Sequence, residues 1–168
     1  MMQYGFAPIR LGLVVLLVLI HSSFGKTIDA ADTSEFFSGH WEGSGTVNMY
    51  IHREAQGTAG CSAFRYSVKQ TKDSFTIQSG YFHCGAQLEI NMGKQEFRIE
   101  SGKLLRYRDY KIEQVGTISN DSVQIYLQTG DVLNAFDIKM EPAGQARYAH
   151  LWTDGYSSLL FNAALSKR

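Results

Sequence analysis

Hydrophobic and polar residues alternate along most of the chain, and the clearest alternation covers residues 38–51. Every second residue there is apolar or glycine, while the residues between are mostly polar. A period of two predicts a strand that buries one face. A tryptophan followed by two glycines on that face predicts a strand that bends sharply or meets another backbone closely. The predicted inward residues are Trp41, Gly43, Gly45, Val47, Met49 and Ile51.

The same alternation recurs in short segments down the rest of the chain, and no long helix is predicted. Turn signals such as Lys72-Asp73, Gly93-Lys94 and Asp154-Gly155 separate the segments. This succession predicts an all-β fold, a single antiparallel up-and-down β-barrel of about ten strands over residues 39–168. The predicted strands cover residues 42–52, 61–70, 74–84, 86–92, 95–101, 103–108, 110–118, 122–128, 132–140, 145–153 and 156–165.

Residues 1–25 have the composition of a secretory signal peptide. Arg10 precedes an apolar run over residues 11–20, and the small residues Ser23 and Gly25 precede a cleavage point before Lys26. The run is too short to span a bilayer, which takes about 20 residues. We expect cleavage, a periplasmic or secreted protein, and no stable membrane anchor afterwards; the alternative is an uncleaved anchor. Residues 26–38 are expected to form a flexible lead-in and a short capping turn.

The overall charge argues against one class of partner. Sixteen Lys and Arg residues balance 16 Asp and Glu residues, which gives a net charge of zero. Proteins that bind nucleic acid normally carry a basic patch, so we expect no nucleic-acid partner. The basic, aromatic stretch over residues 106–111 is interpreted as a solvated strand. The alternative is an anion site at the mouth of the barrel.

Cys61 and Cys84 are the only cysteines, and an exported protein can form a disulfide bond between them. A two-residue turn at Lys72-Asp73 pairs residues whose numbers sum to 145, which places Cys61 opposite Cys84. We interpret this bond as a structural staple, with a redox switch or thiol catalyst as the alternative. This register turns both cysteines outward and turns the following residues inward: Phe64, Tyr66, Val68, Ile77 and Tyr81.

The opening Gly39-x-Trp41-x-Gly43 resembles that of lipocalin-like (calycin) small β-barrels. In those barrels the tryptophan plugs the closed end, so the resemblance implies the same place for Trp41. Extended by Gly45, the pattern is similar to the nitrobindin branch of these barrels.

His150 is the candidate with the most specific chemistry. A two-residue turn at Asp154-Gly155 pairs His150 with Leu159 and places it mid-strand on the aromatic side. In nitrobindin-like barrels a late-strand histidine binds haem iron, and the resemblance implies this role for His150, with haem as the cofactor. The alternative is a core histidine bonded to a tyrosine or to water. No zinc-binding or phosphate-binding motif is present and no set of residues points to one reaction type, so no catalytic residue is proposed. An enzyme such as a barrel cyclase is the least favoured alternative.

An interior lined by aromatic residues either fills itself or holds one apolar ligand. The favoured hypothesis is an exported carrier or sensor that binds a small hydrophobic molecule. One alternative is a haem protein that uses His150, and another is an interaction module or protease inhibitor that binds a protein partner through residues 26–34. The candidate cavity-lining residues are Trp41, Phe64, Tyr66, Tyr81, Tyr148, His150 and Trp152.

Overall fold

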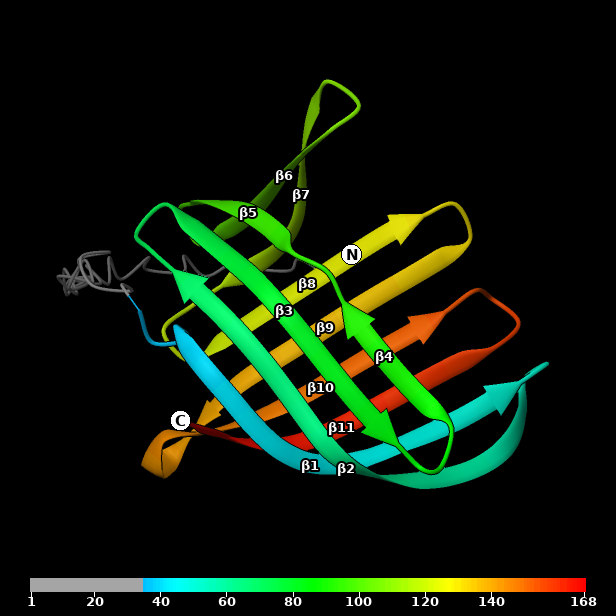
Figure 1. Ribbon diagram of the computed structural model, residues 1–168. Helices are drawn as coiled ribbons and strands as arrows, with labels where there is room; N and C mark the ends of the chain where they lie inside the picture. Colours follow the sequence, from blue (N-terminus) through cyan, green and yellow to red (C-terminus); the bar gives the residue numbers. More distant parts are fainter. Residues whose placement is uncertain (1–34) are drawn as a thin grey trace, which may run out of the picture.

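The computed structural model describes residues 35–168, so the predicted signal peptide and most of the predicted lead-in lie outside the described residues. The described chain forms β-strands joined by short turns (Figure 1). The strands are β1 (Gly39–Ile51), β2 (Glu54–Gln70), β3 (Ser74–Cys84), β4 (Leu88–Met92), β5 (Gln95–Glu100), β6 (Lys103–Arg108), β7 (Lys111–Ile118), β8 (Ser122–Thr129), β9 (Val132–Glu141), β10 (Gln145–Thr153) and β11 (Ser158–Lys167). A 3-10 turn, η1 (Pro142–Gly144), joins β9 to β10.

The strands form one antiparallel sheet that closes on itself. Consecutive strands pair with each other except β4 and β5, which both pair with β3. β1 lies between β2 and β11, and β2 also pairs with β3. The first and last strands are therefore hydrogen-bonded to each other, which removes the free edges there. This arrangement confirms the predicted all-β, up-and-down barrel.

Strands β4 and β5 behave as two halves of one strand. Both pair with β3 in the same register, as the pairs Gly80↔Met92 and Ile77↔Gln95 show. The predicted turn at Gly93-Lys94 is therefore wrong, because the chain continues in the same direction through this break. Counting β4 and β5 together, the eleven strands make a wall of ten, in agreement with the predicted number.

The disulfide bond joins Cys61 to Cys84 as predicted. Part of the pairing between β2 and β3, however, differs from the predicted register. Near the turn, Val68↔Ile77 follows the predicted register. A bulge next to this pair shifts the pairing by one residue, and a second bulge between Cys61 and Ala63 shifts it back. The two shifts cancel, so the cysteines meet although the register between the bulges was predicted wrongly.

A one-residue shift exchanges the two faces of a strand. Phe82 therefore points inward and is fully buried, whereas Tyr81 pairs with Arg65 on the outer face. The Arg65 guanidinium carbon lies 5.8 Å from the centroid of the Tyr81 ring. The prediction that Tyr81 lines the interior is wrong for this reason. The predicted outward orientation of Cys61 and Cys84 is wrong as well, since both are buried in the core.

One end of the barrel is closed by the turn that precedes β1. The Ser38 N–H donates to the Glu35 carbonyl at 3.1 Å, and the buried Phe37 ring packs edge-on against Phe75. The Trp41 indole donates its N–H to the Phe37 carbonyl at 2.9 Å. Trp41 and Phe37 together cover this end of the core, which we call the closed end.

Two glycines let β1 approach β11 closely. A Cβ atom at Gly43 would overlap the carbonyl oxygen of Ala164, and one at Gly45 would overlap that of Asn162. Any larger residue at these positions would separate the strands that close the barrel. The close approach that the glycine spacing predicted is present.

We predict that Gly43→Ala lowers the free energy of unfolding by about 1–3 kcal/mol, because the added methyl group pushes β11 away from β1. Gly60→Ala is the matched control, since a Cβ atom at Gly60 meets nothing within 4 Å. The control should change stability by no more than about 0.5 kcal/mol. Urea unfolding followed by tryptophan fluorescence measures both, and equal stabilities would contradict the packing argument.

Candidate functional site

The centre of the barrel is filled by aromatic rings from opposite walls. Phe64 on β2 and Phe82 on β3 have ring centroids 4.6 Å apart, and Phe82 lies 5.6 Å from the Tyr148 ring on β10. Tyr66 lies 5.3 Å from the same Tyr148 ring. These distances are ordinary packing contacts. Of the predicted cavity-lining residues, Phe64, Tyr66, Tyr148 and His150 come together here, as a packed cluster.

His150 lies at one edge of this cluster between two parallel rings. The Phe136 and Phe161 ring centroids are 4.2 and 5.5 Å from that of His150. The side chain is 3% exposed, and its Nε2 lies 3.3 Å from Asn134 Oδ1. Its Nδ1 is buried and has no hydrogen-bond partner among the described residues. Desolvation by burial lowers the pKa of His150 to about 4, so the imidazole is neutral at pH 7.

Two more polar groups are buried in the same aromatic cluster. The Tyr66 and Tyr148 hydroxyls interact with each other, and neither has another partner within the described residues. Burial raises the pKa of both phenols. A buried polar atom without a partner costs about 1–3 kcal/mol, and His150 Nδ1 is such an atom. Together with the two phenols it marks a place where water or a polar group of a ligand can bind.

The layer above His150 is apolar but only half-buried. Strand pairing places Met49 opposite Leu159, Leu159 opposite Trp152, Trp152 opposite Asn134, and Asn134 opposite Leu127. All five are of intermediate exposure, although they continue the inward-facing side of the wall. The end of the barrel formed by this layer, opposite Trp41, is called the open end below.

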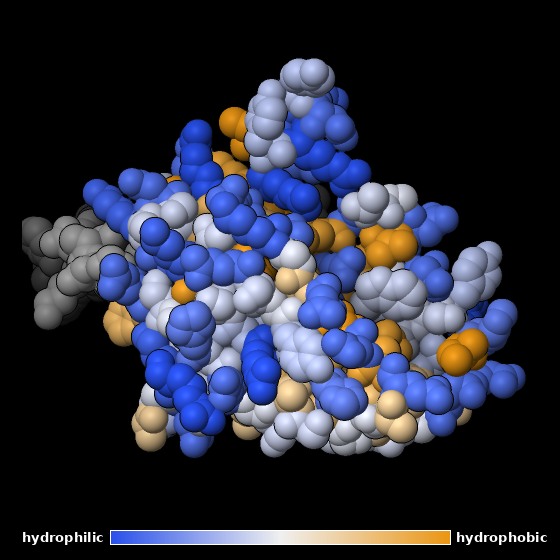
Figure 2. Space-filling view, in the orientation of Figure 1, coloured by the Kyte–Doolittle hydropathy of each residue, from blue (hydrophilic) through white to orange (hydrophobic). Residues whose placement is uncertain are grey.

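The wall is incompletely paired beside the open end. Strand β7 pairs with β8 only over Gly116–Ile118, and β4 pairs only with β3. The β6–β7 hairpin leaves the wall between them and projects from the barrel (Figure 1). Apolar residues are visible between polar ones in the region of β8 and β9, next to the hairpin (Figure 2). The half-buried inner residues of β4 are Leu88, Ile90 and Met92.

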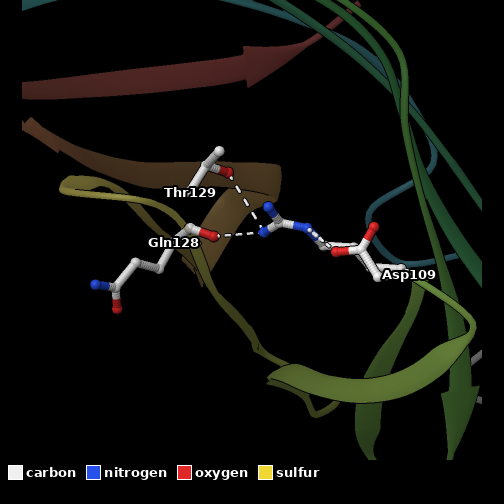
Figure 3. Close-up of polar contacts among 4 residues, drawn as sticks. Asp109, Gln128 and Thr129 are labelled. Carbon is white, nitrogen blue, oxygen red and sulfur yellow. Dashed lines mark hydrogen bonds and ion pairs between the residues drawn. The ribbon is translucent and has the colours of Figure 1, made fainter.

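Arg108 ties the projecting hairpin to the end of β8. Its Nη1 donates to the Gln128 carbonyl at 2.7 Å and to Thr129 Oγ1 at 3.5 Å, and its Nε lies 3.4 Å from Asp109 Oδ2 (Figure 3). The hairpin is therefore oriented relative to the open end by a charged side chain and a main-chain acceptor.

Three predicted site residues lie outside the central cluster. Trp41 is at the closed end, Tyr81 is on the outer face, and Trp152 is in the layer above His150. Hollows of about 380 and 350 Å³ lie along β1 and β2, and the second is bounded in part by Trp41, Tyr66 and Tyr81. Neither hollow includes His150 or Trp152. Four residues that surround His150 are absent from the predicted cavity lining: Asn134, Phe136, Phe161 and Phe82.

The packing around His150 does not fit a haem. Phe136 and Phe161 cover both faces of the imidazole, and Asn134 is next to Nε2. Phe82 and Tyr148, both fully buried, pack edge-on to the imidazole at 6.2 and 6.3 Å between ring centroids. Four buried rings around His150 leave no room for a macrocycle in this packing. Over residues 35–168 there is no cluster of three or more metal-binding side chains. No helix in this part of the chain is long and apolar enough to cross a membrane.

The fold and the site define a closed, antiparallel β-barrel with an aromatic core and an apolar open end. No known family profile matches the chain, and no curated protein does. Among solved structures, EF1p2_mFAP2b bound to DFHBI is 12% identical, with 79% of this chain and 94% of that chain covered and a TM-score of 0.46. A redesigned beta barrel is also 12% identical, with 79% and 92% covered and a TM-score of 0.41.

We predict that stability depends on pH through His150. Its pKa falls from 6.5 in the unfolded chain to about 4 in the folded one, so the unfolded state binds more protons between these values. The contribution of the neutral, buried His150 to the free energy of unfolding is fully present above pH 6.5. It is lost as the pH falls toward 4, by about 3 kcal/mol in total. Urea unfolding across this range should show the loss, and His150→Phe should reduce it. The exposed His52→Gln is the control, and an unchanged slope in His150→Phe would contradict the assignment.

We also predict that haem added to the purified protein produces no Soret shift that depends on His150. Absorption spectra of the wild type and His150→Ala, each with stoichiometric haem, should be the same. A shifted band that disappears in His150→Ala would show that the core opens to admit the cofactor.

Proposed function

We propose that this protein is an exported, non-enzymatic barrel that binds a small hydrophobic molecule at its open end, as a carrier or sensor. The observation that carries the proposal is the half-buried apolar layer formed by Met49, Leu159, Trp152 and Leu127. Each of these side chains faces the interior but stays partly exposed to solvent. The side chains of the layer below are buried. Covering apolar surface stabilises a complex by about 25 cal/mol per Å².

The polar groups beneath this layer suggest what kind of molecule binds. Asn134 belongs to the layer, and His150 below it has an unpaired, buried Nδ1. A neutral imidazole offers one donor and one acceptor. We therefore propose a mainly apolar ligand with one hydrogen-bonding group that reaches His150. The filled aromatic centre supports a ligand at the mouth and not one enclosed in the middle of the barrel.

The proposed export is supported by the bond between Cys61 and Cys84, because disulfides persist in oxidising compartments. The two other sequence-based functions have less support. The site does not fit haem, so the nitrobindin-like alternative would require a rearranged core. The arm proposed for a protease inhibitor falls in residues 26–34, outside the described residues.

We predict that the protein binds an uncharged, environment-sensitive dye such as Nile red, with a blue shift and a rise in emission. Trp152→Gln should weaken binding about tenfold, because about 1.4 kcal/mol of apolar contact is lost. Tyr81→Ala is the matched control, since this aromatic side chain lies on the outer face of the wall. Fluorescence titration gives each dissociation constant.

The proposal would be contradicted if the wild-type protein failed to shift Nile red emission. It would also be contradicted if Tyr81→Ala and Trp152→Gln weakened binding equally, because the dye would then bind elsewhere.

A further inference from the structure

We propose that the open end of the barrel, with the β6–β7 hairpin, docks on the surface of an anionic phospholipid bilayer. This inference concerns an interaction surface and stands apart from ligand binding, because it depends on outward-facing side chains that are not part of the proposed ligand site.

Exposed large apolar side chains are concentrated at one end of the molecule. Seven of the eight in the described chain lie at the open end or on the hairpin beside it. The exception is Phe36, at the closed end. The turns at the closed end are otherwise polar or small, as at Lys72-Asp73 and Asn120-Asp121. The seven are Tyr50, Ile51, Tyr107, Tyr110, Ile112, Tyr126 and Tyr156.

Tyrosine is the common residue in this set, with five of the seven positions. A tyrosine has an apolar ring and a polar tip, and tyrosines gather at the boundary between a bilayer and water. The exposed residues also come from separate segments, namely the end of β1, the β10–β11 loop, β8 and the hairpin. A fluid bilayer surface can contact several separate tips at once, whereas a protein partner would need a matching shape for each.

The hairpin itself has one apolar face and one basic face. Tyr107 is directly opposite Ile112, and Arg108 is directly opposite Lys111. Directly paired residues share a face, and the next pair along lies on the other face. Tyr107 and Ile112 are 68% and 59% exposed. The apolar pair therefore has no covering element among the described residues.

Charge on the hairpin favours an anionic surface. Between residues 103 and 113 the chain has four cations, Lys103, Arg106, Arg108 and Lys111, against two carboxylates, Asp109 and Glu113. The excess is 4 − 2 = 2 positive charges, in a chain whose net charge is zero. Basic residues near an anionic leaflet are attracted to it, and added salt screens that attraction.

The tip of the hairpin presents an aromatic ring to solvent. Asp109 and Tyr110 have φ values of 48° and 63°, the left-handed values of a two-residue turn that fits the twist of a β-hairpin. Tyr110 is 93% exposed, so its ring has little cover from the described residues. The turn therefore holds this tyrosine at the outermost point of the hairpin, where it would meet a bilayer surface.

The experiment is sedimentation of the purified protein with vesicles of phosphatidylcholine, with and without phosphatidylglycerol. We expect binding to the vesicles with phosphatidylglycerol, weakened by added salt because charge contributes. Tyr107→Ser combined with Ile112→Ser should reduce the bound-to-free ratio about tenfold. Phe36→Ser is the matched control and should bind as the wild type does.

Three outcomes would overturn the proposal. The wild type fails to bind vesicles with phosphatidylglycerol, or the hairpin double variant binds as well as Phe36→Ser, or both variants lose binding equally. Circular dichroism verifies that both variants fold. Nile red binding without vesicles, measured on the same variants, separates this result from the proposed ligand site, because the hairpin substitutions should leave that binding unchanged.

Discussion

The structure depends on the hydrogen-bonded contact between the first strand and the last. Gly43 and Gly45 allow the β1 backbone to lie against the carbonyl groups of Ala164 and Asn162, and β1 must also pair with β2 on its other edge. A strand held on both edges has no freedom to turn its faces, so Trp41 is fixed toward the closed end. The interior is a core because the first and last strands join the two ends of the wall here.

Register shifts of one residue and of two residues have different effects on side-chain orientation. This difference explains which orientations the sequence predicted correctly. The turn between β10 and β11 is two residues longer than predicted, so His150 pairs with Phe161 and not with Leu159. A shift of two preserves every face, and the inward orientation of His150 was predicted correctly. The bulges in the β2–β3 pair change the register by one, which reverses Tyr81 and Phe82. Bulges have no sequence signal comparable to that of a Gly-rich turn.

The residues that surround His150 could not be predicted from the local sequence pattern. Periodicity can assign a face to Phe136 or Asn134, but which inward residues meet depends on pairing across strands and on the register of each strand. Likewise, alternation could not tell whether the aromatic residues would line a space or fill it. The rings of Phe82 on β3 and Tyr148 on β10 meet across the centre because a closed wall of this size brings opposite sides within contact distance.

The division of one wall strand into β4 and β5 has a consequence for motion. β5 continues the ring by pairing with both β3 and β6, whereas β4 pairs with β3 alone. Release of β4 would break only its five residue pairs, from Cys84↔Leu88 to Gly80↔Met92. The disulfide bond from Cys84 to Cys61 would keep β3 on β2 meanwhile. Local unfolding of that segment would therefore open the wall beside β4 while β5 keeps the ring closed.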